Sequence, residues 1–182
     1  MGYTSLKRKC YALQKEINVF FVILYLSVIG GCVIIDQVTK LLAEHGKSFQ
    51  VFGSFLGVHY TKNSGMAYGL LADREYAQPL FAIMTIIILV AVLIFLLKTT
   101  NRSKCLHTSI AFIVGGTLGN FIDRLALNYV RDFILLDLRV SFLQFNCNPA
   151  DVFITIGAVL FVVYCLFLDK EAIFKSKKNK EE

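Results

Sequence analysis

Four long apolar stretches alternate with polar segments along the 182-residue chain. They cover residues 17–35, 79–97, 106–122 and 152–168. None of them contains Asp, Glu, Lys or Arg, and a membrane-spanning helix needs about 20 apolar residues, with a range of about 17–25. The pattern therefore predicts four transmembrane helices. The third stretch is diluted by polar residues and glycines, so we expect it to face other helices rather than lipid. The first is longer than the apolar core of a cleaved signal peptide, about 7–15 residues, so we expect it to remain as a helix.

The segments between the spans mix aromatic, β-branched and polar residues with glycine turns. This pattern is typical of short strands. It occurs within residues 41–78 and again within about 125–147. The fold class predicted is therefore an all-α membrane protein, a single domain over residues 1–182, with a small β-cradle on the membrane surface. The aromatic residues of the first segment suit a membrane interface: Phe49, Phe52, Phe55, Tyr60 and Tyr68.

The charge of the chain predicts its orientation. Nineteen Lys and Arg residues outnumber thirteen Asp and Glu, which gives a net charge of +6. Most of the basic residues lie in the N-terminal flank, in the link between the second and third spans, and in the C-terminal tail. Because basic residues stay on the cytoplasmic side, we expect both termini there and residues 36–78 and 123–151 outside. The alternative is a nucleic-acid partner, but three separate juxtamembrane groups favour contact with membrane lipid instead.

The cysteines and histidines do not predict a metal or cofactor site. The five cysteines show no paired spacing, so neither a disulfide framework nor a metal cluster is expected. The three histidines are scattered, and we expect each to be structural.

Three polar motifs lie at the ends of the predicted spans. Asp36 and Lys40 are four residues apart on a continuing helix and can pair, either as a surface salt bridge or as a pair that organises the outer end of the bundle. The run Asn63-Ser-Gly-Met-Ala-Tyr-Gly69 permits tight turns, and in isolation a simple turn between strand and helix is favoured. Its Asn63 side chain can both donate and accept hydrogen bonds.

The third motif is Gly115-Gly-Thr-Leu-Gly-Asn-Phe-Ile-Asp-Arg124. Gly115 and Gly119 form a small-xxx-small face, which lets helices approach closely in lipid. Asn120 and Arg124 fall on one helix face. Helix packing followed by an interfacial anchor explains the glycines, but it does not explain an amide and a guanidinium on the same face.

Two aspartates are the strongest candidates for chemistry. Asp132 lies among apolar residues, and Asp151 lies directly before the fourth apolar stretch. Such acids are costly at the rim of the hydrocarbon layer and are functional candidates by default. Asp151 also has a structural explanation, because acids stabilise helix N-termini and Asn148 is a good N-cap.

If the two carboxyl groups meet, one keeps its proton while the other stays charged. The ionised member can take a proton from water and the neutral member can hydrogen-bond the carbonyl under attack, which is the chemistry of an aspartic protease. Two other classes compete with it: a small membrane transporter or proton-coupled carrier, which uses intramembrane acids, and a structural membrane protein. Transporters tend to place charges near the midplane, and the apolar cores here carry none.

The motifs together resemble those of bacterial lipoprotein signal peptidase, the type II signal peptidase. The resemblance rests on Asp36-Gln-x-x-Lys40, Asn63-x-Gly-x-Ala-Tyr-Gly69, Gly115-Gly-x-x-Gly-Asn-x-x-Asp-Arg124, Val130-x-Asp-Phe-Ile134 and Asn148-x-Ala-Asp151, in this order. It covers about residues 36–154. The resemblance implies a membrane aspartic endopeptidase of the bacterial inner membrane that cuts diacylglyceryl-modified prolipoproteins just before the lipidated cysteine. It further implies sensitivity to the cyclic peptide globomycin, a segment over the site within the first excursion, and no cofactor; we expect a monomer.

The resemblance also implies roles for individual residues. Asp132 and Asp151 would be the catalytic pair. The residues that would bind substrate are Asn63, Asn120, Arg124 and Asn148. The residues that would support the site are Asp36, Lys40, Gly65, Gly116, Asp123 and Ala150.

Four positions depart from the family pattern, and none removes a catalytic group. Tyr68 and Cys147 stand where phenylalanine is usual, Arg131 takes a position that is often apolar, and Pro149 fills a variable position. These departures bear on substrate fit rather than on the reaction.

Overall fold

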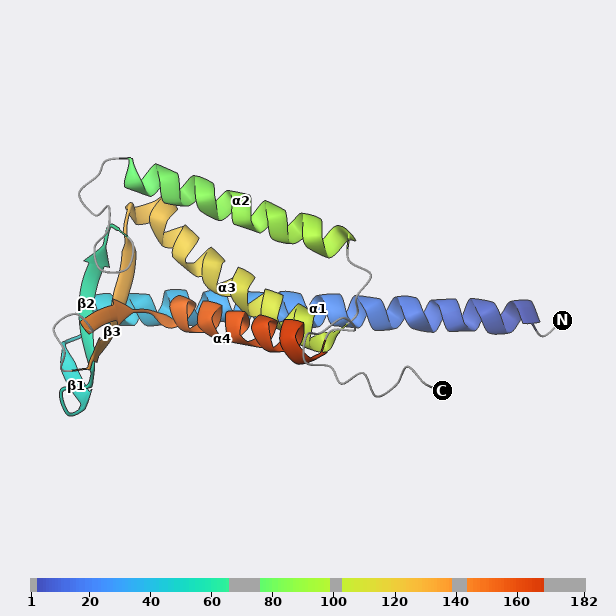
Figure 1. The fold of residues 1–182 in the computed structure, drawn as a ribbon, viewed down its shortest axis with the longest axis horizontal. Coiled ribbons are helices and arrows are strands. Elements are labelled where there is room, and N and C mark those ends of the chain that lie inside the picture. The colour runs from blue at the N-terminus through green and yellow to red at the C-terminus, as the bar shows by residue number, and fades with distance from the viewer. Residues whose placement is uncertain (1–2, 66–75, 99–102, 139–143, 169–182) are drawn as a thin grey trace.

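The computed structural model describes residues 3–65, 76–98, 103–138 and 144–168. Within them the chain forms four long helices and a four-stranded antiparallel sheet (Figure 1). This arrangement confirms the predicted fold class. Part of the first excursion, in which a segment over the site is expected, lies outside the described residues, and so does Tyr68.

The helices contain the four predicted apolar stretches. They are α1 (Tyr3–His45), α2 (Ala77–Lys98), α3 (Lys104–Leu127) and α4 (Pro149–Val163), and α4 continues as a π-helical segment, η2 (Tyr164–Leu168). All four are long and apolar enough to cross a membrane. α1 continues past Lys40 to His45, so its last turns carry polar side chains up to the sheet.

The central helix is α3, which packs against α1, α2 and α4. Its glycines explain the close approach of these neighbours. A Cβ atom on Gly119 would lie 2.5 Å from Asp36 Oδ2 of α1, and one on Gly116 would collide with the backbone carbonyl oxygen of Ala150 in α4. A Cβ atom on Gly115 would lie 2.7 Å from Cys32 Cβ of α1, so the predicted face of Gly115 and Gly119 packs against α1, while Gly116 admits α4.

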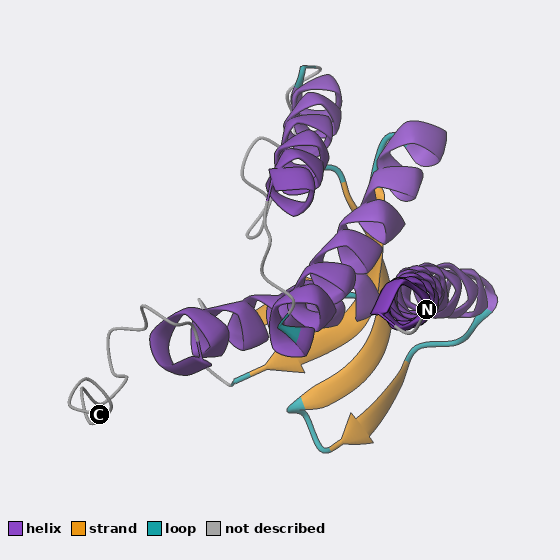
Figure 2. Ribbon diagram, turned by 90° about the vertical axis from the view of Figure 1, so that its right-hand side faces the viewer, coloured by secondary structure: helices purple, strands orange, loops and turns teal. Residues whose placement is uncertain are grey.

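The sheet lies across one end of the helices, opposite the N-terminal end of α1 (Figures 1 and 2). Its strands are β1 (Phe49–Phe52), β2 (Leu56–Asn63), β3 (Val130–Asp137) and β4 (Gln144–Cys147), in that spatial order. β3 follows α3 directly and β4 leads into α4, so the sheet and the helix ends form one continuous structure.

The β1–β2 hairpin exposes apolar rings. The exposed fractions of Phe49, Phe52 and Phe55 are 58%, 73% and 44%, and the turn between the strands contains Gly53 with a φ of 54°. Exposed aromatic side chains beside the ends of four apolar helices are consistent with the predicted position at the membrane interface.

We expect Gly116→Ala to destabilise the bundle by about 1–3 kcal/mol, because the added methyl group forces the α3 and α4 backbones apart. Gly30→Ala makes the same chemical change in α1 at a position with no atom within 4 Å of the new Cβ, so it should not lower stability. Thermal unfolding of the two variants in detergent tests this. Equal melting temperatures would show that the α3–α4 contact tolerates a side chain.

Candidate active site

Asp132 lies on β3 and is nearly inaccessible, with 2% of its surface exposed. Both of its carboxyl oxygens accept hydrogen bonds from side-chain amides: Oδ2 from Asn63 Nδ2 at 2.8 Å and Oδ1 from Asn148 Nδ2 at 2.6 Å. The two donors come from the neighbouring strand β2 and from the start of α4. The carboxyl group is therefore held where the sheet meets the bundle.

Asp151 lies in the first turn of α4 and is partly exposed. It forms a capping box with Asn148: the Asn148 backbone N–H donates to Asp151 Oδ2, and the Asp151 backbone N–H donates to Asn148 Oδ1, both at 3.1 Å. Its other oxygen accepts from Asn120 Nδ2 at 2.8 Å. The structural role expected of Asp151 at a helix start is thus real, and it coexists with the approach to Asp132.

Asn148 connects the two acids. It is completely buried, and its Nδ2 donates to Asp132 Oδ1 and, at 3.1 Å, to Asn120 Oδ1. Because the same residue caps Asp151, the two carboxyl groups are linked through one asparagine. The two acids therefore belong to one hydrogen-bond network, joined by Asn148.

The environment of Asp132 favours its protonated form. Burial raises the pKa of Asp132 to about 6, and the charge of Asp151 acts in the same direction, while the amide hydrogen bonds from Asn63 and Asn148 oppose the shift. Burial and the same two acids raise the pKa of the neighbouring Cys147 thiol to about 11. The thiol is consequently neutral at pH 7.

A buried ionic cluster, formed by residues of α1 and α3, adjoins the two acids. Lys40 and Asp36 have no exposed side-chain surface, and Lys40 Nζ lies 2.8 Å from Asp36 Oδ2, 3.1 Å from Asp123 Oδ2 and 2.9 Å from Asn120 Oδ1. The surface salt bridge considered for Asp36 and Lys40 is therefore wrong, and the alternative, a pair that organises the outer end of the bundle, describes their position. Asp36 Oδ1 also accepts from the backbone N–H of the buried Ala150 at 3.0 Å.

Two members of this cluster were not predicted. Arg131 Nη2 lies 2.6 Å from Asp123 Oδ1 and 2.8 Å from Gln37 Oε1, while Gln37 Nε2 donates to the Gly119 carbonyl oxygen at 3.0 Å. The hydrogen bonds and the charge of Asp123 raise the pKa of Arg131 despite its burial. The signal in the sequence was a guanidinium beside Asp132 in an apolar strand, at a position noted only as a departure.

The remaining predicted residues lie around the same site. The Gly65 backbone N–H donates to Asn63 Oδ1 at 3.1 Å, and the side chain of Gln78, at the start of α2, donates to the Ser64 carbonyl oxygen. The guanidinium of Arg124 lies over the Phe81 ring at 5.4 Å. Arg124 Nε is buried and has no hydrogen-bond partner among the described residues.

The described residues contain no group of three or more His, Cys, Asp and Glu side chains arranged to hold a metal ion. What the site does offer is two linked carboxyl groups with unequal burial, plus a guanidinium with unused hydrogen-bonding capacity. Such a pair can divide the roles of proton acceptor and proton donor.

A family profile, curated sequences and solved structures all show similarity to this chain. The family profile of signal peptidase (SPase) II matches residues 28–167. A lipoprotein signal peptidase of Staphylococcus aureus (strain JH9) is 36% identical over 155 residues, which cover 82% of this chain and 87% of the relative. One of Clostridium novyi (strain NT) is 29% identical over 145 residues, covering 78% and 95%. A bacterial membrane enzyme solved by the in meso method at 1.9 Å resolution matches with a TM-score of 0.70 and 33% identity, over 84% of this chain and 96% of that one.

We expect Lys40→Met to lower the free energy of unfolding by about 3–5 kcal/mol, because it leaves the charges of Asp36 and Asp123 buried without their shared cation. Lys62→Met is a matched control, since Lys62 is exposed and its ammonium lies over the Tyr129 ring at 5.0 Å from the centroid. Thermal or denaturant unfolding in detergent measures both. Similar stability of the two variants would show that the cluster adds nothing to the fold.

Proposed function

The chain belongs to the signal peptidase II family, and from this premise we propose that Asp132 and Asp151 are its catalytic pair. The protein is a bacterial multi-pass membrane peptidase of the aspartic type, and it removes signal peptides from prolipoproteins. One observation carries the assignment of the pair: Asn148 hydrogen-bonds both carboxyl groups while 0% of its surface is exposed. Because the chain belongs to this peptidase family, we reject the alternative that the two acids serve a transporter.

In the first step, the Asp151 carboxylate takes a proton from a water molecule, and the water oxygen bonds to the scissile carbonyl carbon. Asp132 donates its proton to the carbonyl oxygen, which leaves a neutral diol on that carbon. In the second step, the C–N bond breaks, the leaving amine takes the proton from Asp151, and a diol hydroxyl returns a proton to Asp132. The pair thus ends in its starting state, and each carboxyl acts both as acid and as base.

The assignment of the resting proton to Asp132 rests on the difference between the two environments. Asp132 is the more deeply buried acid and its pKa is raised to about 6. Asp151 is partly exposed and lies in the first turn of α4, where the helix dipole favours negative charge. Its two oxygens accept from N–H groups of Asn120 and Asn148.

The residues around the pair divide between positioning and binding. The amides of Asn120 and Asn148 are occupied by Lys40, by each other and by the two acids, so we assign them positioning roles in place of the substrate contacts expected for them. Arg124 Nε has no partner among the described residues, and a guanidinium suits a substrate carbonyl oxygen. Asn63 donates to Asp132 and accepts from the Gly65 backbone N–H, so it also positions Asp132.

The substrate is a prolipoprotein, and the proposal specifies a precursor whose cysteine carries a diacylglyceryl thioether, cut on the N-terminal side of that cysteine. The site lies at the sheet end of four apolar helices (Figure 1), which is the depth at which a lipid-anchored cysteine would stand. The distribution of basic residues supports cytoplasmic termini and a site toward the outer face. The monomeric state and inhibition by globomycin stay predictions.

We expect Asp132→Asn and Asp151→Asn each to lower the rate of precursor cleavage by about 10²–10⁴-fold, because neither variant can complete both proton transfers. Asp137→Asn makes the same change on the same strand, β3, away from the pair, and should leave the rate unchanged. The measurement is gel-resolved cleavage of a diacylglyceryl-modified precursor by purified enzyme, with thermal unfolding as a check of folding. Full activity in either variant would remove that acid from the mechanism.

The pH dependence of kcat/KM should show an alkaline limb governed by Asp132, because activity requires its proton and its pKa lies at about 6. Asn63→Ala removes a donor that stabilises the charged form, so the pKa of Asp132 rises and the limb moves to higher pH. Ser48→Ala, an exposed change on the approach to β1, should leave the limb in place.

The raised pKa of Asp132 also makes the free energy of unfolding depend on pH. Its dependence is opposite to that of a salt-bridged acid, whose pKa is lowered. Between the ordinary value of 3.8 and about 6, the unfolded chain loses this proton while the folded protein keeps it, so the contribution of Asp132 to stability falls as pH rises.

In the pH profile of kcat/KM, an alkaline limb that moves to lower pH in Asn63→Ala, or does not move, would assign the titration to another group.

A further inference from the structure

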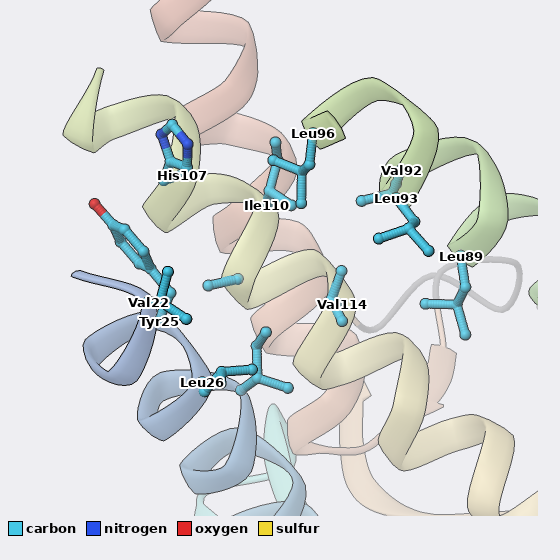
Figure 3. Close-up of a pocket in the computed structure, with 12 residues that line it drawn as sticks. Val22, Tyr25, Leu26, Leu89, Val92, Leu93, Leu96, His107, Ile110 and Val114 are labelled. Carbon is cyan, nitrogen blue, oxygen red and sulfur yellow. The ribbon is translucent and has the colours of Figure 1, made fainter. Parts of the chain in front are cut away.

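A second concave feature lies on the far side of the bundle from the aspartates. It is an apolar groove of about 370 Å³ between α1, α2 and α3 (Figure 3). All of its lining residues are aliphatic except Tyr25 and His107. The nearest lining residue on α3 is Val114, six positions before Asn120, or about 9 Å along the helix axis. The groove is therefore separate from the catalytic site.

One end of the groove is polar and basic. Tyr25 stacks on His107 with ring centroids 5.5 Å apart, and Phe21 stacks on Tyr25 at 6.3 Å. The ammonium of Lys104 lies 5.5 Å from the centre of the Phe21 ring and is exposed. His107 Nδ1 donates to the Ser103 carbonyl oxygen at 2.9 Å, which fixes the ring at the groove end. A cation and a phenolic hydroxyl thus adjoin an apolar channel.

We propose that this groove binds an anionic phospholipid, with an acyl chain along the aliphatic lining and the head-group phosphate beside Lys104 and the Tyr25 hydroxyl. Basic pockets between transmembrane helices are known to hold anionic head groups, and the cytoplasmic leaflet is rich in them. In the sequence, further lysines and arginines precede the apolar part of α1 and the start of α3.

The signal peptide of the substrate is another apolar ligand that could occupy the groove. Charge distinguishes it from an anionic lipid. A signal peptide carries a positively charged region before its apolar core. With its cleavage site at the aspartates and its apolar core in this groove, that region would meet the like charge of Lys104. An anionic lipid meets the same lysine with the opposite charge.

A bound lipid would support α2. At the sheet end α2 contacts the site through Gln78, which donates to the Ser64 carbonyl oxygen, and through Phe81 beneath Arg124. At the other end the groove separates part of α2 from α1 (Figure 3). An acyl chain there fills the space between Leu26 of α1 and Leu93 of α2, and so helps to fix the helix that carries Phe81.

The test is lipid retention by native mass spectrometry of the purified enzyme, after addition of phosphatidylglycerol or phosphatidylcholine. We expect phosphatidylglycerol to be retained in preference, and Lys104→Gln to weaken its retention about fivefold. Lys47→Gln, an exposed change at the sheet end, should have no effect. Leu93→Trp fills the groove and should lower retention of both lipids. Equal retention of the two lipids, or an unchanged Lys104→Gln variant, would overturn the proposal.

Replacement of Leu93 by the photo-reactive residue p-benzoylphenylalanine identifies the occupant directly. Cross-linking to phospholipid in membranes supports the proposal. Cross-linking to added precursor, or to a second copy of the chain, would overturn it and assign the groove to that partner. Neither measurement depends on cleavage, so the outcome is independent of the roles assigned to Asp132 and Asp151.

Discussion

The whole sheet end of the molecule depends on one buried cation. The Lys40 ammonium has no exposed surface and lies within 3.1 Å of two carboxylates and one amide, contributed by α1 and α3. An unpaired charge in such a place would be very costly, whereas a paired and hydrogen-bonded one is tolerated. Because Asp36, Asp123 and Asn120 each have further partners, their common partner Lys40 ties α1, α3, β3 and α4 into one unit.

Strand β3 transmits this constraint to Asp132, and through Asn148 to Asp151. Successive side chains of a strand point to opposite faces, so Arg131 turns toward Asp123 and Gln37 while Asp132 turns toward Asn63 and Asn148. The backbone N–H of Arg131 also donates to Asp123 Oδ2 at 3.0 Å. One residue therefore fixes the strand from behind, and its neighbour presents the acid to the site.

Much of this arrangement could be predicted from the sequence, and the limits have physical causes. The four helices follow from uncharged apolar runs, and the two acids stand out because carboxyl groups are rare at such positions. Burial of Asp36 with Lys40 could not be read from an i, i+4 spacing, which is the same in a surface pair. Arg131 was missed because its partner Asp123 lies on another element. Only the packing of β3 against the end of α3 brings the two side chains together.

The orientation of the Asn120 amide shows how the ionic cluster and the chemistry are coupled. Its oxygen accepts from Lys40 and Asn148, which leaves its Nδ2 directed at Asp151 Oδ1. A flipped amide would point N–H groups at an ammonium and an oxygen at a carboxylate, so a charged Lys40 permits only the observed state. That state supplies Asp151 Oδ1 with a donor at 2.8 Å. Lys40 thus fixes the donor that Asp151 receives, although it makes no hydrogen bond to either acid in the described network.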